Sequence, residues 1–463
     1  MSRIGIIGYN SINLIKKVTE IWNAGNSVVL IDPLMPVPMQ FEIMRMTKTE
    51  LCFIDDSIYQ KKLYYKSNDS EISFQSYIGT TGFTEVCIES LGYKTNYTDN
   101  EAVVIFSSGT TGISKGIILT HKAININADA IIEYMGINKN DTLYIAKPFS
   151  HSSTFVGEIL VSLKVKNRIV LAKPTVPPRV ILKNLSQYNC TFVCLNPYLL
   201  KLITEDQKKN CYNLNSLKKI YVSGSRLYDD LWLDARHTFG NTEILNVYGL
   251  TEAGPRVSAQ RGNEKNNSVG KPISNVKVII TDAKGNKKAP LDIGIVSVKS
   301  PSMMKGYLNS SSKESVYKNW LNTGDIGYTD EDGYLYIIDR MSDVIVINSH
   351  NIIPTTIEDR INSIEGIDSS CVFKASVNKN DVLCCVYTGN EVSSLEIRRK
   401  LSESSLNYEI PCFFKNIKSM PMTLTKKMDR NEIKKKFLQE FLQRIEKISV
   451  SYTHLTLPTI LLV

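Results

Sequence analysis

A run of small and hydroxyl-bearing residues between two apolar segments most limits how this chain can fold. Ser107 to Gly112 reads Ser-Ser-Gly-Thr-Thr-Gly, and Lys115 follows shortly after. Val103 to Phe106 and Ile117 to Thr120 are apolar and predict a strand on either side. Such a loop can turn successive N–H groups, hydroxyls and a lysine towards one anion. The segment therefore predicts a strand–loop–strand unit that binds a polyphosphate.

This loop does not follow the Walker A pattern, which needs four residues between its glycines and then Gly-Lys-Ser/Thr before a helix. Here the order is Gly109-Thr-Thr-Gly112-Ile-Ser-Lys115-Gly116, and a strand follows. A flexible surface loop is the alternative for any cluster of Gly, Ser and Thr. The rest of the chain has to decide between the two interpretations.

Composition excludes several classes of protein. The 463 residues carry a net charge of +9 that is dispersed apart from short lysine runs, which suits small anions such as nucleotides. No zinc-finger spacing or ribonucleoprotein motif appears, so we expect no nucleic-acid partner. The five histidines show no metal-ligand spacing. Nine cysteines without a Cys-x-x-Cys pair, no signal peptide and no long apolar run predict a cytoplasmic protein with free thiols and no membrane span.

The alternation of strand and helix patterns over the first 240 residues predicts an α/β fold with several layers. Short strands separated by Asp- and Gly-rich turns predict a β-rich subdomain over 270–340. A small α+β domain follows, in which Ile433, Phe437, Phe441 and Ile445 form one apolar stripe of a helix. We expect a large ATP- and acid-binding domain over 1–339, a small C-terminal lid domain over 340–447, and an atypical tail over 448–463.

The amino-terminal segment imitates a dinucleotide-binding unit. Ile4 to Gly8, a helical stretch and a strand ending at Asp32 form a βαβ pattern. The fingerprint Gly-x-Gly-x-x-Gly would then need glycines where Asn10 and Asn13 stand. We therefore keep the βαβ unit and regard a nicotinamide-dependent oxidoreductase as the weakest alternative.

Two further segments carry residues suited to a nucleotide. Asn246-Val-Tyr248-Gly249-Leu-Thr251-Glu252 offers a flat aromatic surface for a purine, a hydroxyl for phosphate and a carboxylate that can hold Mg²⁺. Asn322-Thr-Gly-Asp325 places a carboxylate after a tight turn, where it can accept both hydroxyls of a ribose. A strand-to-turn junction and an ordinary Asx-type turn are the structural alternatives.

Two later segments carry positive charge. Asp339-Arg340-Met-Ser342-Asp343 contains an arginine that a surface salt bridge could equally explain. Lys426-Lys427-Met-Asp-Arg430 contains a lysine whose compact ammonium can bridge a carboxylate and a phosphate. A solvated lysine pair is the alternative there.

The five segments together, in this order and spacing, resemble the adenylate-forming superfamily of acyl- and aryl-coenzyme A ligases, peptide-synthetase adenylation domains and luciferases. The resemblance runs from about residue 3 to 447. It implies that Lys427 and Arg340 are catalytic, that Glu252 holds the metal, and that Ser342 lies at an interdomain hinge. It implies a nucleotide site made of Ser107, Ser108, Gly109, Thr110, Thr111, Gly112, Lys115, Gly224, Ser225, Asn246, Tyr248, Gly249, Thr251, Asp325 and Arg340.

The chemistry implied is ATP-dependent, Mg²⁺-assisted activation of a carboxylic acid to an acyl-adenylate with release of pyrophosphate. The acyl group then passes to a thiol, which predicts coenzyme A or a phosphopantetheine arm as cosubstrate. Pro148-Phe-Ser-His151 resembles the acyl- and aryl-ligase form, so His151 is expected beside the acid. No Asp stands there to pair with an amino group, which disfavours an amino acid substrate; packing beside a loop is the alternative for His151.

This chain departs from the family pattern at several positions. Asn348-Ser-His350 replaces a glycine that the thiol arm passes, Lys426 replaces another glycine, and Ser114 replaces a common proline. The late start predicts a truncated or compact member, and the uncharged tail from Ser449 is either a last strand or a foreign segment. Two alternatives remain: an enzyme that loads a carrier protein, and a nucleotide-binding pseudoenzyme. These residues do not identify the acid.

Overall fold

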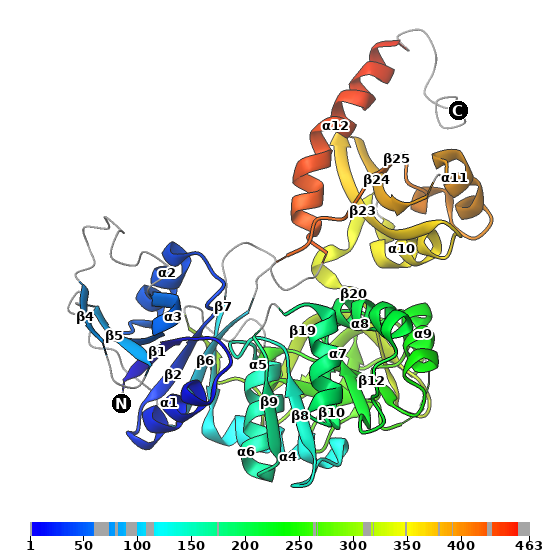
Figure 1. Ribbon diagram of the computed structural model, residues 1–463. Coiled ribbons are helices and arrows are strands. Elements are labelled where there is room, and N and C mark those ends of the chain that lie inside the picture. Colours follow the sequence, from blue (N-terminus) through cyan, green and yellow to red (C-terminus); the bar gives the residue numbers. More distant parts are fainter. Residues whose placement is uncertain are drawn as a thin grey trace. The chain divides into compact units, whose positions relative to one another are not determined.

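The computed structural model describes residues 2–59, 74–78, 82–88, 100–107, 115–173, 176–262, 265, 267–308, 316–317, 319–347, 350–377, 380–390, 392–423 and 428–451. Within them the chain forms two compact units. The first comprises Met1–Thr323 and Tyr328–Tyr336, and the second comprises Gly324–Gly327 and Ile337–Val463 (Figure 1).

An eight-stranded sheet opens the first unit, in the order β17-β7-β6-β2-β1-β3-β5-β4. Its central strands β6, β2, β1 and β3 are parallel, and the outer strands pair antiparallel. The strands are β1 (Arg3–Ile7), β2 (Ser27–Ile31), β3 (Leu51–Asp55), β4 (Phe74–Ile78), β5 (Phe83–Ile88), β6 (Glu101–Ser107), β7 (Lys115–Thr120) and β17 (Gly306–Tyr307). The helices along this part of the chain are α1 (Ile12–Asn23), α2 (Val37–Thr47) and α3 (Asp56–Tyr59).

A second, seven-stranded sheet of the same unit has the order β14-β13-β12-β11-β10-β8-β9. Strands β8 to β12 are parallel, while β13 and β14 are antiparallel. The strands are β8 (Thr142–Ile145), β9 (Arg168–Leu171), β10 (Phe192–Leu195), β11 (Lys219–Val222), β12 (Glu243–Gly249), β13 (Arg256–Ala259) and β14 (Lys271–Pro272). The helices are α4 (His121–Met135), α5 (Ser152–Thr154), the π-helix η2 (Phe155–Leu160), α6 (Val161–Val165), α7 (Pro178–Gln187), α8 (Pro197–Asn210), α9 (Asp229–Phe239) and the 3-10 helix η3 (Thr251–Ala253).

The parallel strands are apolar runs. A parallel sheet is covered on both faces, so both faces of its strands carry apolar side chains. Helices α7, α8 and α9 bury Leu182, Leu200 and Trp232 in one core with strands of the second sheet. Thr120 begins α4 by accepting a hydrogen bond from the N–H of Ala123, which satisfies an otherwise unpaired donor.

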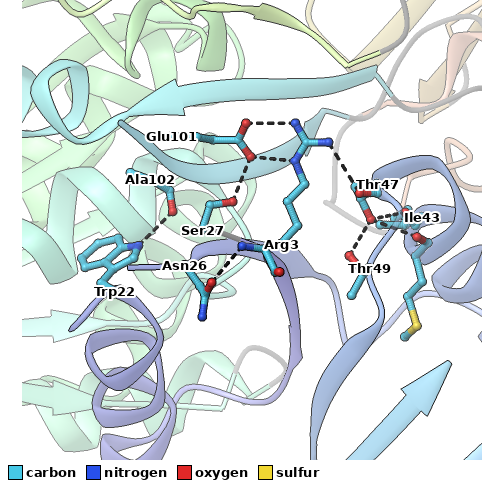
Figure 2. Close-up of polar contacts among 11 residues, drawn as sticks. Arg3, Trp22, Asn26, Ser27, Ile43, Thr47, Thr49, Glu101 and Ala102 are labelled. Atoms are coloured by element: carbon cyan, nitrogen blue, oxygen red, sulfur yellow. Dashed lines mark hydrogen bonds and ion pairs between the residues drawn. The ribbon is translucent and has the colours of Figure 1, made fainter. Parts of the chain in front are cut away.

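The opposite edge of the first sheet contains a buried ion pair (Figure 2). Arg3 donates from Nε to Glu101 Oε1 at 2.7 Å and from its terminal nitrogen to Oε2 at 2.9 Å. Ser27 adds a hydroxyl donor at 2.8 Å, and the Thr47 carbonyl accepts from Arg3 at 3.5 Å. Arg3, Ser27 and Glu101 each begin a strand, so this cluster joins the amino ends of β1, β2 and β6.

The expected β-rich segment forms a five-stranded sheet in the order β15-β16-β19-β18, with β20 pairing β19. Its strands are β15 (Lys277–Thr281), β16 (Gly294–Lys299), β18 (Val316–Tyr317), β19 (Trp320–Thr329) and β20 (Leu335–Arg340). Strands β19 and β20 each contribute residues to both units.

The second unit is built on a three-stranded sheet, β23 (Ile367–Val377), β24 (Asn380–Gly389) and β25 (Phe413–Asn416). Helices α10 (Pro354–Asn362) and α11 (Ser394–Ser402) share one core with it. Helix α12 (Arg430–Ser451) packs Ile433, Phe437 and Phe441 into a separate core with β23 and β24, as the stripe predicted. The remaining elements are the 3-10 helix η5 (Met341–Asp343), the hairpin β21 (Ile345–Ile347) and β22 (His350–Ile352), and the 3-10 helix η6 (Asn407–Glu409).

The predicted multi-layer α/β class with a small C-terminal α+β unit is confirmed. In the segment that resembles a dinucleotide-binding unit, Asn10 and Asp32 have structural roles. Asn10 donates to the carbonyls of Lys147 and Ala172 at 2.9 and 3.0 Å, and Asp32 accepts from Ser150 at 3.0 Å. These side chains tie the two sheets together.

In the described part of the chain, no helix has both the length and the hydropathy of a membrane span. Eight of the nine cysteines, Cys52, Cys190, Cys194, Cys211, Cys371, Cys384, Cys385 and Cys412, are free thiols. The cytoplasmic location stays a prediction.

Candidate nucleotide and acid site

The base of the Ser- and Gly-rich loop is a β-hairpin. Ser107 ends β6 and Lys115 begins β7, and the two residues pair directly in the antiparallel ladder. Ser108, Gly109, Thr110, Thr111 and Gly112 lie outside the described residues. The strand–loop–strand arrangement around the loop is therefore confirmed, while the path of the loop stays a prediction.

Tyr307 connects the lysine at the base of the loop with the predicted metal ligand, and it was not among the residues predicted from the sequence. Its strand β17 pairs with β7, which places Tyr307 opposite Ile117. The Lys115 ammonium lies 5.2 Å from the centroid of the Tyr307 ring, within cation–π range. The Tyr307 hydroxyl donates to Glu252 Oε1 at 3.0 Å. One tyrosine thus contacts both the lysine at the loop base and the predicted metal ligand.

Several predicted residues gather where the parallel strands of the second sheet end, the usual position of ligands in α/β folds. Gly224 and Ser225 are exposed just beyond β11, and Tyr248 and Gly249 end β12. A side chain at Gly249 would come within 2.0 Å of the Pro255 carbonyl oxygen, so only glycine allows the close approach of these backbones.

Asn246 lies in the same strand as Tyr248 but is buried, with 7% of its surface exposed. Its Nδ2 donates to the Ser268 carbonyl at 3.3 Å, and its N–H donates to Gln260 Oε1 at 2.8 Å. The side chain therefore supports the end of the strand, and its predicted contact with nucleotide is untested.

His151 precedes α5, at the amino end of a helical segment that continues into the π-helix η2. The next residue, Ser152, shares a hydrogen bond of 2.8 Å with the hydroxyl of Thr251. That contact brings the segment that carries the predicted acid-pocket residue His151 to the predicted phosphate-contacting Thr251, although the two segments are far apart in sequence.

Asp325 and Arg340 form an ion pair within the second unit, with Arg340 Nε 2.7 Å from Asp325 Oδ1. Asp325 is 4% exposed, whereas the Arg340 side chain is 53% exposed. The predicted ribose carboxylate and the predicted ribose- or phosphate-contacting arginine therefore lie side by side, on the neighbouring strands β19 and β20.

Lys427 lies outside the described residues, but both ends of its segment are anchored. Met422 and Met428 form an isolated β-bridge, and the Asp429 N–H donates to the Pro421 carbonyl at 2.9 Å. Arg430 then makes two hydrogen bonds to the carboxylate of Glu358, at 2.7 and 2.5 Å. Burial raises the pKa of Glu358, and the Arg430 charge opposes that rise.

The residues present fit a Mg²⁺ ion that is shared with phosphate oxygens. Among the described residues, no group of three His, Cys, Asp or Glu side chains could hold a metal alone. Mg²⁺ commonly uses one or two carboxylates together with substrate phosphates and water. Glu252 supplies one such carboxylate, which the Tyr307 hydroxyl orients.

Known proteins resemble this chain in sequence and in fold. It is 26% identical over 408 residues to 2-succinylbenzoate–CoA ligase of Bacillus velezensis, covering 84% of this chain and 82% of that protein. It is 27% identical over 356 residues to Surfactin synthase subunit 2 of Bacillus subtilis, covering 73% of this chain but only 10% of that protein.

Among solved structures, O-succinylbenzoate coenzyme A synthetase (MenE) of Bacillus subtilis, in complex with ATP and a magnesium ion, has a TM-score of 0.78. The identity is 23%, covering 94% of this chain and 89% of that one, so this likeness shows a shared fold. Residues 1–308 match the model of the family described as AMP-binding enzyme. The chain therefore belongs to the AMP-binding enzyme family and is an adenylate-forming protein of the acyl-CoA synthetase type.

Proposed function

We propose that this protein activates a carboxylic acid with ATP and transfers the acyl group to the thiol of coenzyme A. The observation that carries the proposal is the Tyr307 contact with both Lys115 and Glu252. It joins a cation at the base of a Gly- and Ser-rich loop to a carboxylate suited to Mg²⁺. Such a pair is what a triphosphate needs, because its negative charge must be neutralised where it accumulates.

In the first step a carboxylate oxygen of the acid attacks the α-phosphorus of ATP. The bond from that phosphorus to the bridging oxygen breaks, which gives an acyl-adenylate and pyrophosphate. Lys115 and the backbone of residues 108–112 bind the phosphates, and Thr251 contacts them by its hydroxyl. Tyr248 and Gly249 form the surface for adenine beside Gly224 and Ser225, and Asp325 holds the ribose hydroxyls. A Mg²⁺ ion on Glu252 would supply further positive charge.

Lys427 and Arg340 have the catalytic roles in this proposal, and the lid is the unit that carries Lys427. An ammonium between the two reacting anions lowers their repulsion as they approach. In the second step a thiolate attacks the carbonyl carbon of the adenylate, and AMP leaves. Closure of the lid keeps water away from the mixed anhydride. The cytoplasm, where thiols stay reduced, is the proposed location.

The test is ATP–pyrophosphate exchange across a panel of fatty, aryl and amino acids. We expect exchange with at least one fatty or aryl acid and a loss of about 100-fold or more in Lys427→Ala. Lys426→Ala is the matched control, because it removes the same charge from the neighbouring position. Wild-type exchange in Lys427→Ala contradicts the assigned role, and ATP binding without exchange for any acid supports a pseudoenzyme.

A carrier protein is the second candidate acceptor, because Asn348-Ser-His350 replaces the glycine expected where the thiol arm passes. The His350 ring also stacks on Tyr408, with ring centroids 4.1 Å apart. Once the acid is known, thioester formation is measured with free coenzyme A and with a phosphopantetheinylated carrier protein. A turnover ratio above about tenfold in favour of either thiol decides between the two acceptors.

A further inference from the structure

Three charged side chains are buried together beside the predicted acid pocket. Lys147 follows β8, Glu158 lies on the π-helix η2, and Arg256 begins β13. Arg256 is 3% exposed and Glu158 is 0% exposed, and the Lys147 side chain is 11% exposed. Lys147 Nζ lies 2.8 Å from Glu158 Oε1. We call these three residues the acid-pocket cluster.

The charges of this cluster do not balance. Lys147 and Arg256 are two cations, and among the described residues Glu158 is the carboxylate that interacts with both of them. Burial raises the pKa of Glu158, and Lys147 and then Arg256 oppose the rise. A guanidinium group is a permanent cation in proteins. The cluster therefore holds about one positive charge in excess where charge is costly.

Arg256 is held in position while part of its guanidinium lacks a partner. Its backbone N–H donates to Asn127 Oδ1 at 2.9 Å, and its carbonyl accepts from Asn127 Nδ2 at 3.0 Å. In the described part of the chain, Arg256 Nε is buried without a hydrogen-bond partner. Gly157 adjoins the guanidinium, since a side chain there would meet a terminal nitrogen of Arg256 at 3.6 Å. The guanidinium thus has one buried donor without an acceptor, and Gly157 and Tyr134 are among its neighbours.

The unsatisfied arginine is adjacent to the site already described. Arg256 pairs with Gly249 in the ladder between β12 and β13. Gly249 directly follows Tyr248, the residue predicted to contact adenine. Glu158 and Lys147 flank His151 along the chain. The Ser152–Thr251 hydrogen bond connects this helical segment to the phosphate side.

From these observations we propose that the acid activated by this protein is a dicarboxylic acid, whose second carboxylate binds Arg256. The inference rests on the function proposed above and narrows its substrate class. A second carboxylate would balance the charge of the cluster and give Nε an acceptor. Arginine suits this task because its planar group binds a carboxylate by two parallel hydrogen bonds.

Of the two carboxylates of a dicarboxylic acid, the one that reacts with ATP is the less suitable partner for Arg256. That carboxylate loses its charge when it forms the mixed anhydride, so a buried arginine that held it would stabilise the reactant over the transition state. The second carboxylate keeps its charge through both steps. Its attraction to Arg256 positions the substrate without opposing the reaction.

The experiment compares each dicarboxylic acid with its own monomethyl ester in ATP–pyrophosphate exchange. Straight-chain and aryl acids of increasing length form the panel, and each pair differs by one charge at nearly equal size. For the best acid we expect kcat/KM to exceed that of the monoester by about 30-fold or more. The ratio should fall to about 1 in Arg256→Met and should be partly retained in Arg256→Lys, which keeps the charge.

Arg179→Met is the control, because Arg179 is exposed on α7 and should keep the wild-type ratio. Equal or better exchange with the monoesters in the wild-type protein overturns the inference. An equal loss for acid and ester in Arg256→Met also overturns it, since Arg256 would then act on the reacting carboxylate or on folding.

A binding measurement separates this inference from the proposed function. Thermal unfolding is followed with each dicarboxylic acid and each monoester in the absence of ATP. A rise in Tm with the diacid that Arg256→Met abolishes supports the Arg256 site, even where no acid supports exchange. Lack of exchange alone contradicts the proposed function, and lack of both signals overturns the site as well.

Discussion

Two buried arginines of the first unit have opposite surroundings. Arg3 meets both oxygens of Glu101, and Ser27 and the Thr47 carbonyl complete the hydrogen bonds of that pair (Figure 2). Arg256 shares Glu158 with Lys147 and leaves Nε without a partner among the described residues. A balanced, hydrogen-bonded pair needs no ligand, whereas an excess buried charge does. The difference separates a structural charge from one that is available for binding.

Removal of Glu158 should have the largest effect on stability. Glu158→Gln removes the carboxylate that interacts with the buried Arg256 and the largely buried Lys147, and we expect a loss of about 5 kcal/mol in the free energy of unfolding. Urea unfolding at neutral pH measures it. The double variant Glu158→Gln with Arg256→Met should recover part of the loss. A cost below about 1 kcal/mol for the single variant would show that the cluster is well solvated.

Arg3→Met should be the next most destabilising change, by about 3 kcal/mol, because it leaves the Glu101 carboxylate buried with the Ser27 hydroxyl as its remaining side-chain donor among the described residues. The double variant Arg3→Met with Glu101→Leu serves as the control. It removes both charges and should be nearly as stable as the wild type. The same urea titration gives both values.

Arg256→Met should change stability by less than about 1 kcal/mol, even though Arg256 is more deeply buried than Arg3, with 3% of its surface exposed against 9%. Its removal leaves Lys147 and Glu158 as a balanced pair. The contrast with Arg3→Met is the sharpest test of the comparison. A loss similar to that of Arg3→Met would mean that Arg256 is a structural charge like Arg3.

Two serines that contact the charged groups of the two regions should have modest effects. Ser27→Ala removes a buried donor to the Glu101 carboxylate and should cost about 1.5 kcal/mol. Ser153→Ala removes only a half-buried acceptor 3.3 Å from Lys147 Nζ and should cost about 0.5 kcal/mol. Thermal shifts measured side by side rank the two, and a reversed order would contradict the view that the Arg3 cluster is the tighter one.

Local patterns predicted much of the fold. The stripe Ile433, Phe437 and Phe441 predicted the buried face of α12, because a helix places residues four apart on one side. The apolar runs beside the Ser- and Gly-rich loop predicted β6 and β7. These predictions depended only on residues that are close together in the sequence.

The candidate site was predicted only in part. Glu252 and Lys115 were singled out as charged residues in recognisable segments, and the contact through Tyr307 was not. A glycine followed by an aromatic at Gly306-Tyr307 was the available signal, yet it named no partner. The Asp325–Arg340 pair was likewise predicted as two separate ligands, because pairing across strands depends on register.

The amino-acid sequence by itself determined the α/β class, the family and the kinds of residue that meet a nucleotide. Tertiary structure alone decided which charges are balanced. Arg3 and Arg256 are chemically identical, and neither has a distinguishing neighbour along the chain. Their roles diverge because the energy of a buried charge depends on the groups that surround it in space, and those groups come from distant strands and helices.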